Sequence, residues 1–115
     1  MPATDKTDLV RAVFAAYRTK DRQVVEDALA DDFIFTSPYD DAIDKARYFQ
    51  RCWPNSKRIK THVIEKIWEH GDEAVVQYRC VTIEGKEFRN TEFFRFDGDK
   101  IASVDVYFGR TLKEA

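Results

Sequence analysis

Glu92 is the residue of this sequence best placed to do chemistry, because it shares a mostly apolar strand face. Alternate residues of a strand point the same way, so within Phe88–Phe96 the neighbours of Glu92 on that face include Asn90 and Phe94. A carboxyl group among apolar side chains is poorly solvated, which raises its pKa and suits it to general acid or base catalysis. The alternative is a structural glutamate that is paired with a donor and never meets a ligand.

Asn90 and Tyr78 are the predicted partners of Glu92 in catalysis. Both could donate hydrogen bonds to an enolate that develops on a carbonyl-bearing substrate, with Glu92 moving the proton. Asn90 could equally serve only to satisfy the interior of the sheet.

The position of Tyr78 depends on the loop that follows its strand. A three-residue loop at 84–86 pairs Tyr78 with Glu92, whereas a two-residue loop brings Gln77 and Arg79 to the site instead, because a slip of one residue exchanges the two faces. We favour the first register since it gathers the apolar side chains. In the second, Arg79 would become the charge partner of Glu92 and would lower its pKa.

Further side chains are predicted to line a ligand pocket, but each has a simpler alternative. His62 could reach the inner face of the sheet or lie on an exposed edge. Phe49 and Trp53 could form the mouth of the pocket or belong to the ordinary core. The complete set of predicted ligand-binding residues is Tyr17, Phe49, Trp53, His62, Phe94, Val104 and Phe108.

The first half of the chain has the period of amphipathic helices. A stripe from Leu9 to Tyr17 predicts one helix, with Asp5 as its N-cap. A second short helix follows Asp21, and a third begins at Asp44 and ends before Pro54. Between the last two, residues 33–36 are typical of a short strand.

The second half is typical of a sheet. Glycine-containing turns separate four β-branched and aromatic segments at 59–68, 74–83, 88–96 and 101–108. Short turns join antiparallel neighbours, so we predict a four-stranded meander whose long strands twist and curl beneath the helices. Asp105 and Tyr107 are predicted to face its outer side. The fold class is therefore α+β, in one domain spanning residues 1–115.

Composition excludes several functions. The chain has 115 residues and a net charge of −2 without a basic stripe, which gives no support to nucleic-acid binding. No apolar run is long enough to span a membrane, and the N-terminus has no secretory pattern. Cys52 and Cys80 stand apart, which favours a reduced, cytoplasmic protein. The two histidines form no metal motif, so we expect neither a metal nor another cofactor.

Three stretches of the sequence are similar to those of a known group of proteins, namely Ala30–Phe35, Asn90–Ile101 and Val106–Gly109. On these stretches the chain resembles the nuclear transport factor 2-like superfamily, and within it the SnoaL-like group. This resemblance implies a cone-shaped roll of three helices on a curled sheet, and a homodimer formed through the outer face of the sheet. It leaves the activity open, because the superfamily holds isomerases, cyclases, dehydratases, epoxide hydrolases and non-catalytic binders.

Comparison with ketosteroid isomerase, a related enzyme, carries over one of three functional positions. Its general base falls on Ser37, which cannot abstract a proton, and its oxyanion tyrosine falls on Val13, which donates nothing. Its protonated carboxylic acid falls on Glu92. The resemblance therefore implies something other than a true ketosteroid isomerase.

Two functions remain open. One is a cofactor-independent isomerase, cyclase or dehydratase that uses Glu92 on a small apolar substrate with a carbonyl group. The other is a non-catalytic module that binds a ligand or forms a dimer.

Overall fold

The computed structural model describes residues 6–114, so the predicted cap Asp5 lies outside the described residues. Helix α1 (Lys6–Thr19) buries one stripe of its surface, which includes Val10, Val13 and Phe14. Lys20 follows it in a left-handed conformation, with a φ of 64°. Helix α2 (Arg22–Ala28) begins at Asp21, whose carboxylate accepts a hydrogen bond from the backbone N–H of Val24.

Helix α3 (Lys45–Arg51) begins where the sequence predicts. The carboxylate of Asp44 accepts a 2.8 Å hydrogen bond from the backbone N–H of Arg47 and so caps the first turn. A 3₁₀ segment, η1 (Trp53–Arg58), follows with Pro54 in its first turn. This segment leads directly into the first strand of the meander.

The sheet has six strands in the order β2-β1-β6-β5-β4-β3. The predicted meander is confirmed as β3 (Ile59–His70), β4 (Glu73–Thr82), β5 (Glu87–Asp97) and β6 (Lys100–Lys113), all paired antiparallel. Strand β1 (Leu29–Thr36) starts earlier than predicted and pairs with β6 in parallel, while the short β2 (Ile43–Asp44) extends the edge. The sheet is therefore mixed rather than wholly antiparallel.

The predicted register between β4 and β5 is wrong by two residues. Tyr78 lies opposite Asn90, and Val76 lies opposite Glu92. The turn begins earlier than predicted, since the backbone N–H of Thr82 already donates to the carbonyl of Lys86. A slip of two residues keeps every side chain on its predicted face, because the strand period is two. Tyr78 therefore still shares the face of Glu92.

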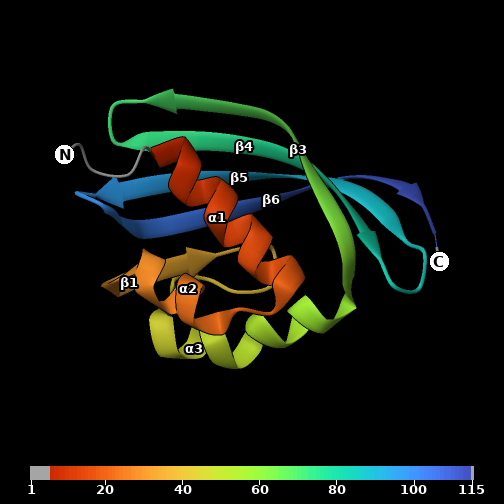
Figure 1. Ribbon diagram of the computed structural model, residues 1–115, viewed down its shortest axis with the longest axis horizontal. Coiled ribbons are helices and arrows are strands. Elements are labelled where there is room, and N and C mark those ends of the chain that lie inside the picture. The colour runs from red at the N-terminus through yellow and green to blue at the C-terminus, as the bar shows by residue number, and fades with distance from the viewer. Residues whose placement is uncertain (1–5, 115) are drawn as a thin grey trace.

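The helices lie on one side of the sheet. Figure 1 shows α1 crossing the inner face of the meander, with α2 and α3 beside β1. Register shifts in β3 and in the β5–β6 pair mark bulges, which bend strands and increase their twist. Among the described residues, no helix has the length and apolar character to cross a membrane. The buried core between helices and sheet includes Val10, Phe14, Val25, Phe33, Tyr48, Val76, Phe94 and Ile101.

Candidate functional site

Glu92 lies on the inner face of β5, with Val76 on one neighbouring strand and Val106 on the other. Its side chain is partly buried, and one carboxylate oxygen accepts a 2.7 Å hydrogen bond from the hydroxyl of Tyr78. Burial raises the pKa of Glu92 to about 7, against a smaller lowering by the Tyr78 hydrogen bond. At neutral pH the group is therefore poised between its acid and its base form.

Two further hydrogen bonds hold Tyr78 in place. The buried side-chain amide of Asn90 donates to the Tyr78 hydroxyl over 3.3 Å, and its carbonyl accepts a 3.2 Å bond from the backbone N–H of Gly109. Gly109 lies at a register shift in the β5–β6 pair, where a Cβ atom would collide with the backbone carbonyl of Arg89. The absence of a side chain thus lets β6 approach Asn90 closely.

A pair of tyrosines closes the site from the helices. The Tyr17 hydroxyl on α1 is hydrogen-bonded to the Tyr48 hydroxyl on α3. Burial raises the pKa of both phenols, and the charge of Glu92 contributes to each rise. The same two causes contribute to raising the pKa of Cys80 to about 11. The phenols and this thiol are therefore neutral near pH 7, which leaves Glu92 as the group among them that titrates there.

Aromatic rings surround this polar group. Phe14 contacts the Tyr78 ring edge-on, with 4.9 Å between centroids, and Trp53 contacts Tyr17 in the same manner at 4.8 Å. Trp53 is partly buried and packs against the core, so its place at a pocket mouth stays a prediction. The structure thus places Tyr78 against the predicted catalytic carboxylate and Tyr17 within reach of its charge, with Trp53 packed on Tyr17.

His62 lies on the inner face of the sheet, so its predicted alternative on an exposed edge is wrong. It is buried, with its ring 4.9 Å from that of Phe14, and its Nδ1 lies 3.2 Å from a guanidinium nitrogen of Arg18. Burial lowers its pKa to about 4, and the charge of Arg18 adds to the lowering. His62 is therefore neutral near pH 7, and its Nδ1 accepts from Arg18, because a guanidinium only donates.

Three other predicted ligand-binding residues belong to the core or are exposed to solvent. Phe94 and Val104 are almost fully buried in the core, where Phe94 contacts the ring of Phe14. Phe108 lies opposite Asn90 on the same face of the sheet but is 49% exposed, and its ring contacts that of Tyr39 at 5.2 Å. The first two thus act as core residues in this structure, and Phe108 lies at the solvent boundary.

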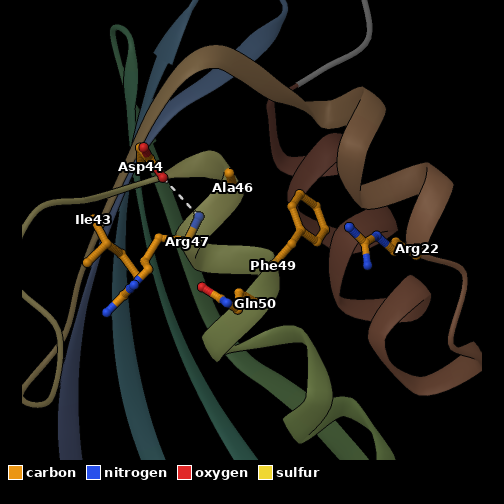
Figure 2. Close-up of a pocket in the computed structure, with 7 residues that line it drawn as sticks. All are labelled: Arg22, Ile43, Asp44, Ala46, Arg47, Phe49 and Gln50. Atoms are coloured by element: carbon orange, nitrogen blue, oxygen red, sulfur yellow. Dashed lines mark hydrogen bonds between the residues drawn. The ribbon is translucent and has the colours of Figure 1, made fainter.

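Phe49 is buried and belongs to the core, which was the simpler of its two predicted alternatives. It lines a hollow of about 640 Å³ between α2 and α3, together with Arg22, Arg47 and Gln50 (Figure 2). The Arg22 guanidinium lies over its ring at 4.7 Å. A second hollow, of about 520 Å³, lies near Lys45 and Lys100. Neither hollow contains Glu92.

The arginines of the sheet point away from Glu92. Arg79 forms an ion pair with Glu87, and Arg89 forms one with Glu65. Arg79 therefore does not pair with Glu92, and the alternative register that would have joined them is wrong. Between residues 6 and 114, no three histidine, cysteine or carboxylate side chains gather in a way that could hold a metal ion.

Sequence reasoning missed the hydrogen-bond partners of Tyr48 and Arg18 and the role of Gly109. Tyr48 lies one helical turn after the Asp44 cap and four residues before Cys52, and this spacing predicts that it lies on the inner face of α3. The sequence does not predict its partner on α1, because that contact depends on how the two helices pack. Gly109 differs from the other glycines in following a strand rather than a turn signal, which indicates a close backbone approach.

Residues 10–104 match the family model of the SnoaL-like domain. The chain belongs to the SnoaL-like family. No curated protein matches the sequence of this SnoaL-like chain.

Solved structures share the fold of this SnoaL-like chain at low identity. An NTF2-like protein of unknown function from Cytophaga hutchinsonii is 23% identical, with a TM-score of 0.75, over 90% of this chain and 89% of that one. An LEH-like epoxide hydrolase of M. tuberculosis is 22% identical, with a TM-score of 0.76, over 92% and 84%. A Catenulispora acidiphila protein with a ketosteroid isomerase-like fold, in complex with trimethylamine, is 16% identical, with a TM-score of 0.73, over 88% and 85%. These likenesses establish the NTF2-like fold.

Proposed function

We propose that this SnoaL-like chain binds a small, largely apolar molecule beside Glu92 and that Glu92 exchanges a proton with it. The observation that carries the proposal is the hydrogen-bonded pair of Tyr78 and Glu92 on an aromatic-lined inner face. Burial raises the pKa of Glu92 to about 7, so both of its protonation states are available at neutral pH. A partly exposed carboxyl group of this kind can act as a general acid or a general base.

The activity that fits best is cofactor-independent proton transfer of the isomerase, cyclase or dehydratase type. Tyr78 donates a hydrogen bond to Glu92, and Asn90 donates one to Tyr78. In this proposal the two residues therefore position the carboxyl group. Two structural relatives, described as an epoxide hydrolase and as a complex with trimethylamine, support a small-molecule role for this fold.

A non-catalytic binding module is the second candidate. Ser37 and Val13 occupy the positions where ketosteroid isomerase has its base and its oxyanion tyrosine. Val13 is buried and apolar, and the Ser37 hydroxyl accepts a hydrogen bond from the backbone of Tyr39. In this version Glu92 recognises a ligand without transforming it, and a homodimer forms through the outer sheet face.

The test is a small-molecule screen by thermal shift on the wild type and on Glu92→Gln. Glu65→Gln is the matched control, since it removes the same charge from the opposite face of the sheet. A hit that stabilises the wild type and Glu65→Gln but not Glu92→Gln supports the proposed site. A hit that stabilises all three equally removes Glu92 from it. Turnover of the hit then separates the catalytic candidate from the binding one.

A further inference from the structure

Glu92 has no positively charged partner. Among the described residues its side chain has one hydrogen bond, from the neutral hydroxyl of Tyr78, and it takes part in no ion pair. A desolvated carboxylate without a counter-charge is costly, and the raised pKa of Glu92 is a measure of that cost.

The nearest arginines cannot supply the missing charge from where they lie. Arg79 and Arg89 neighbour the site along their strands, but their side chains point outward to Glu87 and Glu65. Arg18, on the helix that covers the site, lies against His62 instead. A positive charge beside Glu92 must therefore come from outside these residues.

Tyr78 and Asn90, the donors beside Glu92, each make a hydrogen bond within the protein. The single O–H of Tyr78 points to Glu92, and Asn90 donates to Tyr78. Tyr17 and Tyr48 share one hydrogen bond, which uses one of their two O–H groups. The bond from Tyr78 uses one oxygen of the Glu92 carboxylate, and no hydrogen bond from the described residues reaches the other oxygen. This second oxygen suits a ligand that donates a hydrogen bond or carries positive charge.

The surrounding rings favour the same kind of ligand. Tyr17 and Tyr48 lie near enough to Glu92 for its charge to raise their pKa, and Trp53 packs on Tyr17. The faces of tyrosine and tryptophan rings carry negative electrostatic potential and attract organic cations. A single carboxylate among aromatic rings is a poor site for a metal ion, which needs several ligands, but a good one for an alkylated ammonium group.

We propose that the ligand of this site carries a positively charged nitrogen with apolar substituents, which pairs with Glu92 and lies against Tyr17, Tyr78 and Trp53. The proposal rests on the proposed function, since it names the class of molecule that binds beside Glu92. The ammonium group supplies the counter-charge that the chain itself lacks.

Binding of such a cation must depend on pH through Glu92. The titratable groups that face Glu92 are Tyr17 from α1, Tyr48 from α3, Cys52 directly after α3, and Tyr78 and Cys80 from β4. Burial raises the pKa of each of these five groups, so each stays neutral around pH 7. Glu92 is then the group that switches the site between a neutral and a negative form.

The experiment measures binding of choline, tetramethylammonium and benzyltrimethylammonium to the whole chain by calorimetry and NMR. Each cation is compared with its neutral carbon analogue, in which a quaternary carbon replaces the nitrogen. Because quaternary nitrogen does not titrate, affinity should fall by the factor that ionised Glu92 contributes, more than about tenfold, between about pH 9 and about pH 5 as Glu92 takes up its proton. The carboxyl carbon signal of Glu92 should show its pKa falling when a cation binds.

We expect at least one cation to bind more than about tenfold tighter than its neutral analogue, as a contact of this kind allows. The preference should vanish in Glu92→Gln and persist in Glu65→Gln. Neutral analogues that bind as tightly as the cations at the Glu92 site would overturn the cation proposal and leave the proposed function standing. No binding of any cation at millimolar concentration also overturns it. If, in addition, every hit of the small-molecule screen stabilises Glu92→Gln as much as the wild type, the proposed function fails as well.

Discussion

Tyr78 and Glu92 are joined by a 2.7 Å hydrogen bond although they are not opposite each other, since Tyr78 faces Asn90 and Glu92 faces Val76. The bond runs diagonally across two strands, which a long phenol side chain can span on one face of a sheet. The diagonal leaves Asn90 free to hold the phenol from the side. Glu92 is thereby oriented by neutral groups alone.

Glu92 is expected to make stability fall as pH rises. Its pKa is raised from 4.5 to about 7 in the folded chain, so the folded state binds more protons between these values than the unfolded state. The contribution of Glu92 to the free energy of unfolding amounts to roughly 3 kcal/mol. It is fully present below the unfolded pKa and is lost as the pH rises through the folded pKa. Because His62 contributes in the opposite direction over this range, urea unfolding should show stability rising with pH in Glu92→Gln and a nearly flat profile in Glu65→Gln. An unchanged pH profile in Glu92→Gln would contradict the burial of this carboxyl group.

His62 is expected to act in the opposite direction. Its pKa is lowered from 6.5 to about 4, so the unfolded state binds more protons and stability is lost as pH falls through this window. The magnitude is again roughly 3 kcal/mol. The two contributions nearly cancel in the wild type between about pH 4.5 and about pH 6.5. In His62→Asn, urea unfolding should therefore show stability falling as pH rises, because the contribution of Glu92 is no longer offset. His70→Asn, at an exposed position, is the control and should keep the wild-type dependence of stability on pH.

Tyr78→Phe should raise the pKa of Glu92 above its wild-type value of about 7, because the Tyr78 hydrogen bond lowers it. The lost bond to a carboxylate should also cost about 1–3 kcal/mol of stability above pH 7. The carboxyl carbon signal of Glu92 reports the pKa, and urea unfolding reports the stability. Tyr107→Phe removes a hydroxyl from an exposed tyrosine and should change neither. Equal pKa values in Tyr78→Phe and the wild type would show that the phenol does not orient the carboxylate in solution.

Gly109→Ala should disturb the site from a distance. The added methyl group would collide with the carbonyl of Arg89, so β6 must move and the Gly109–Asn90 bond must lengthen. Overpacking of this kind costs about 1–3 kcal/mol. The loss should be accompanied by a changed pKa of Glu92, because Asn90 then no longer fixes Tyr78. Arg110→Ala, at the exposed neighbouring position, is the control. A stability loss with an unaltered pKa would confine Gly109 to a structural role.

The proposed homodimer should depend on the outer face of the sheet. Tyr107 is 61% exposed and lies opposite Thr91, on the face away from Glu92. A charge at the centre of such an interface opposes association, so Tyr107→Arg should shift the chain toward monomers in light scattering. Tyr39→Arg, at a loop position that is 78% exposed, should not. A wild type that remains monomeric at high concentration would contradict the dimer.

The sequence predicted those features that follow from local periodicity. Alternation in β5 was sufficient to place Glu92 and Asn90 on the inner face, because face depends only on counting by two. The exact partner of Tyr78 was mispredicted, since the turn after Thr82 could close at several points with the same faces. The Tyr17–Tyr48 and Arg18–His62 contacts join distant elements, and no local pattern encodes how those elements pack.

The parallel pairing of β1 with β6 has a consequence for how the chain is made. Neighbouring strands of the meander can pair as soon as each hairpin has left the ribosome, but Leu29 and Phe35 must wait for Ile101 and Val104. Long-range pairing of this kind is slow, and unpaired strand edges favour aggregation. During synthesis the edge of β1 that faces β6 therefore stays open until residues 101–105 have emerged. We expect protein truncated before β6 to be captured by chaperones rather than to fold.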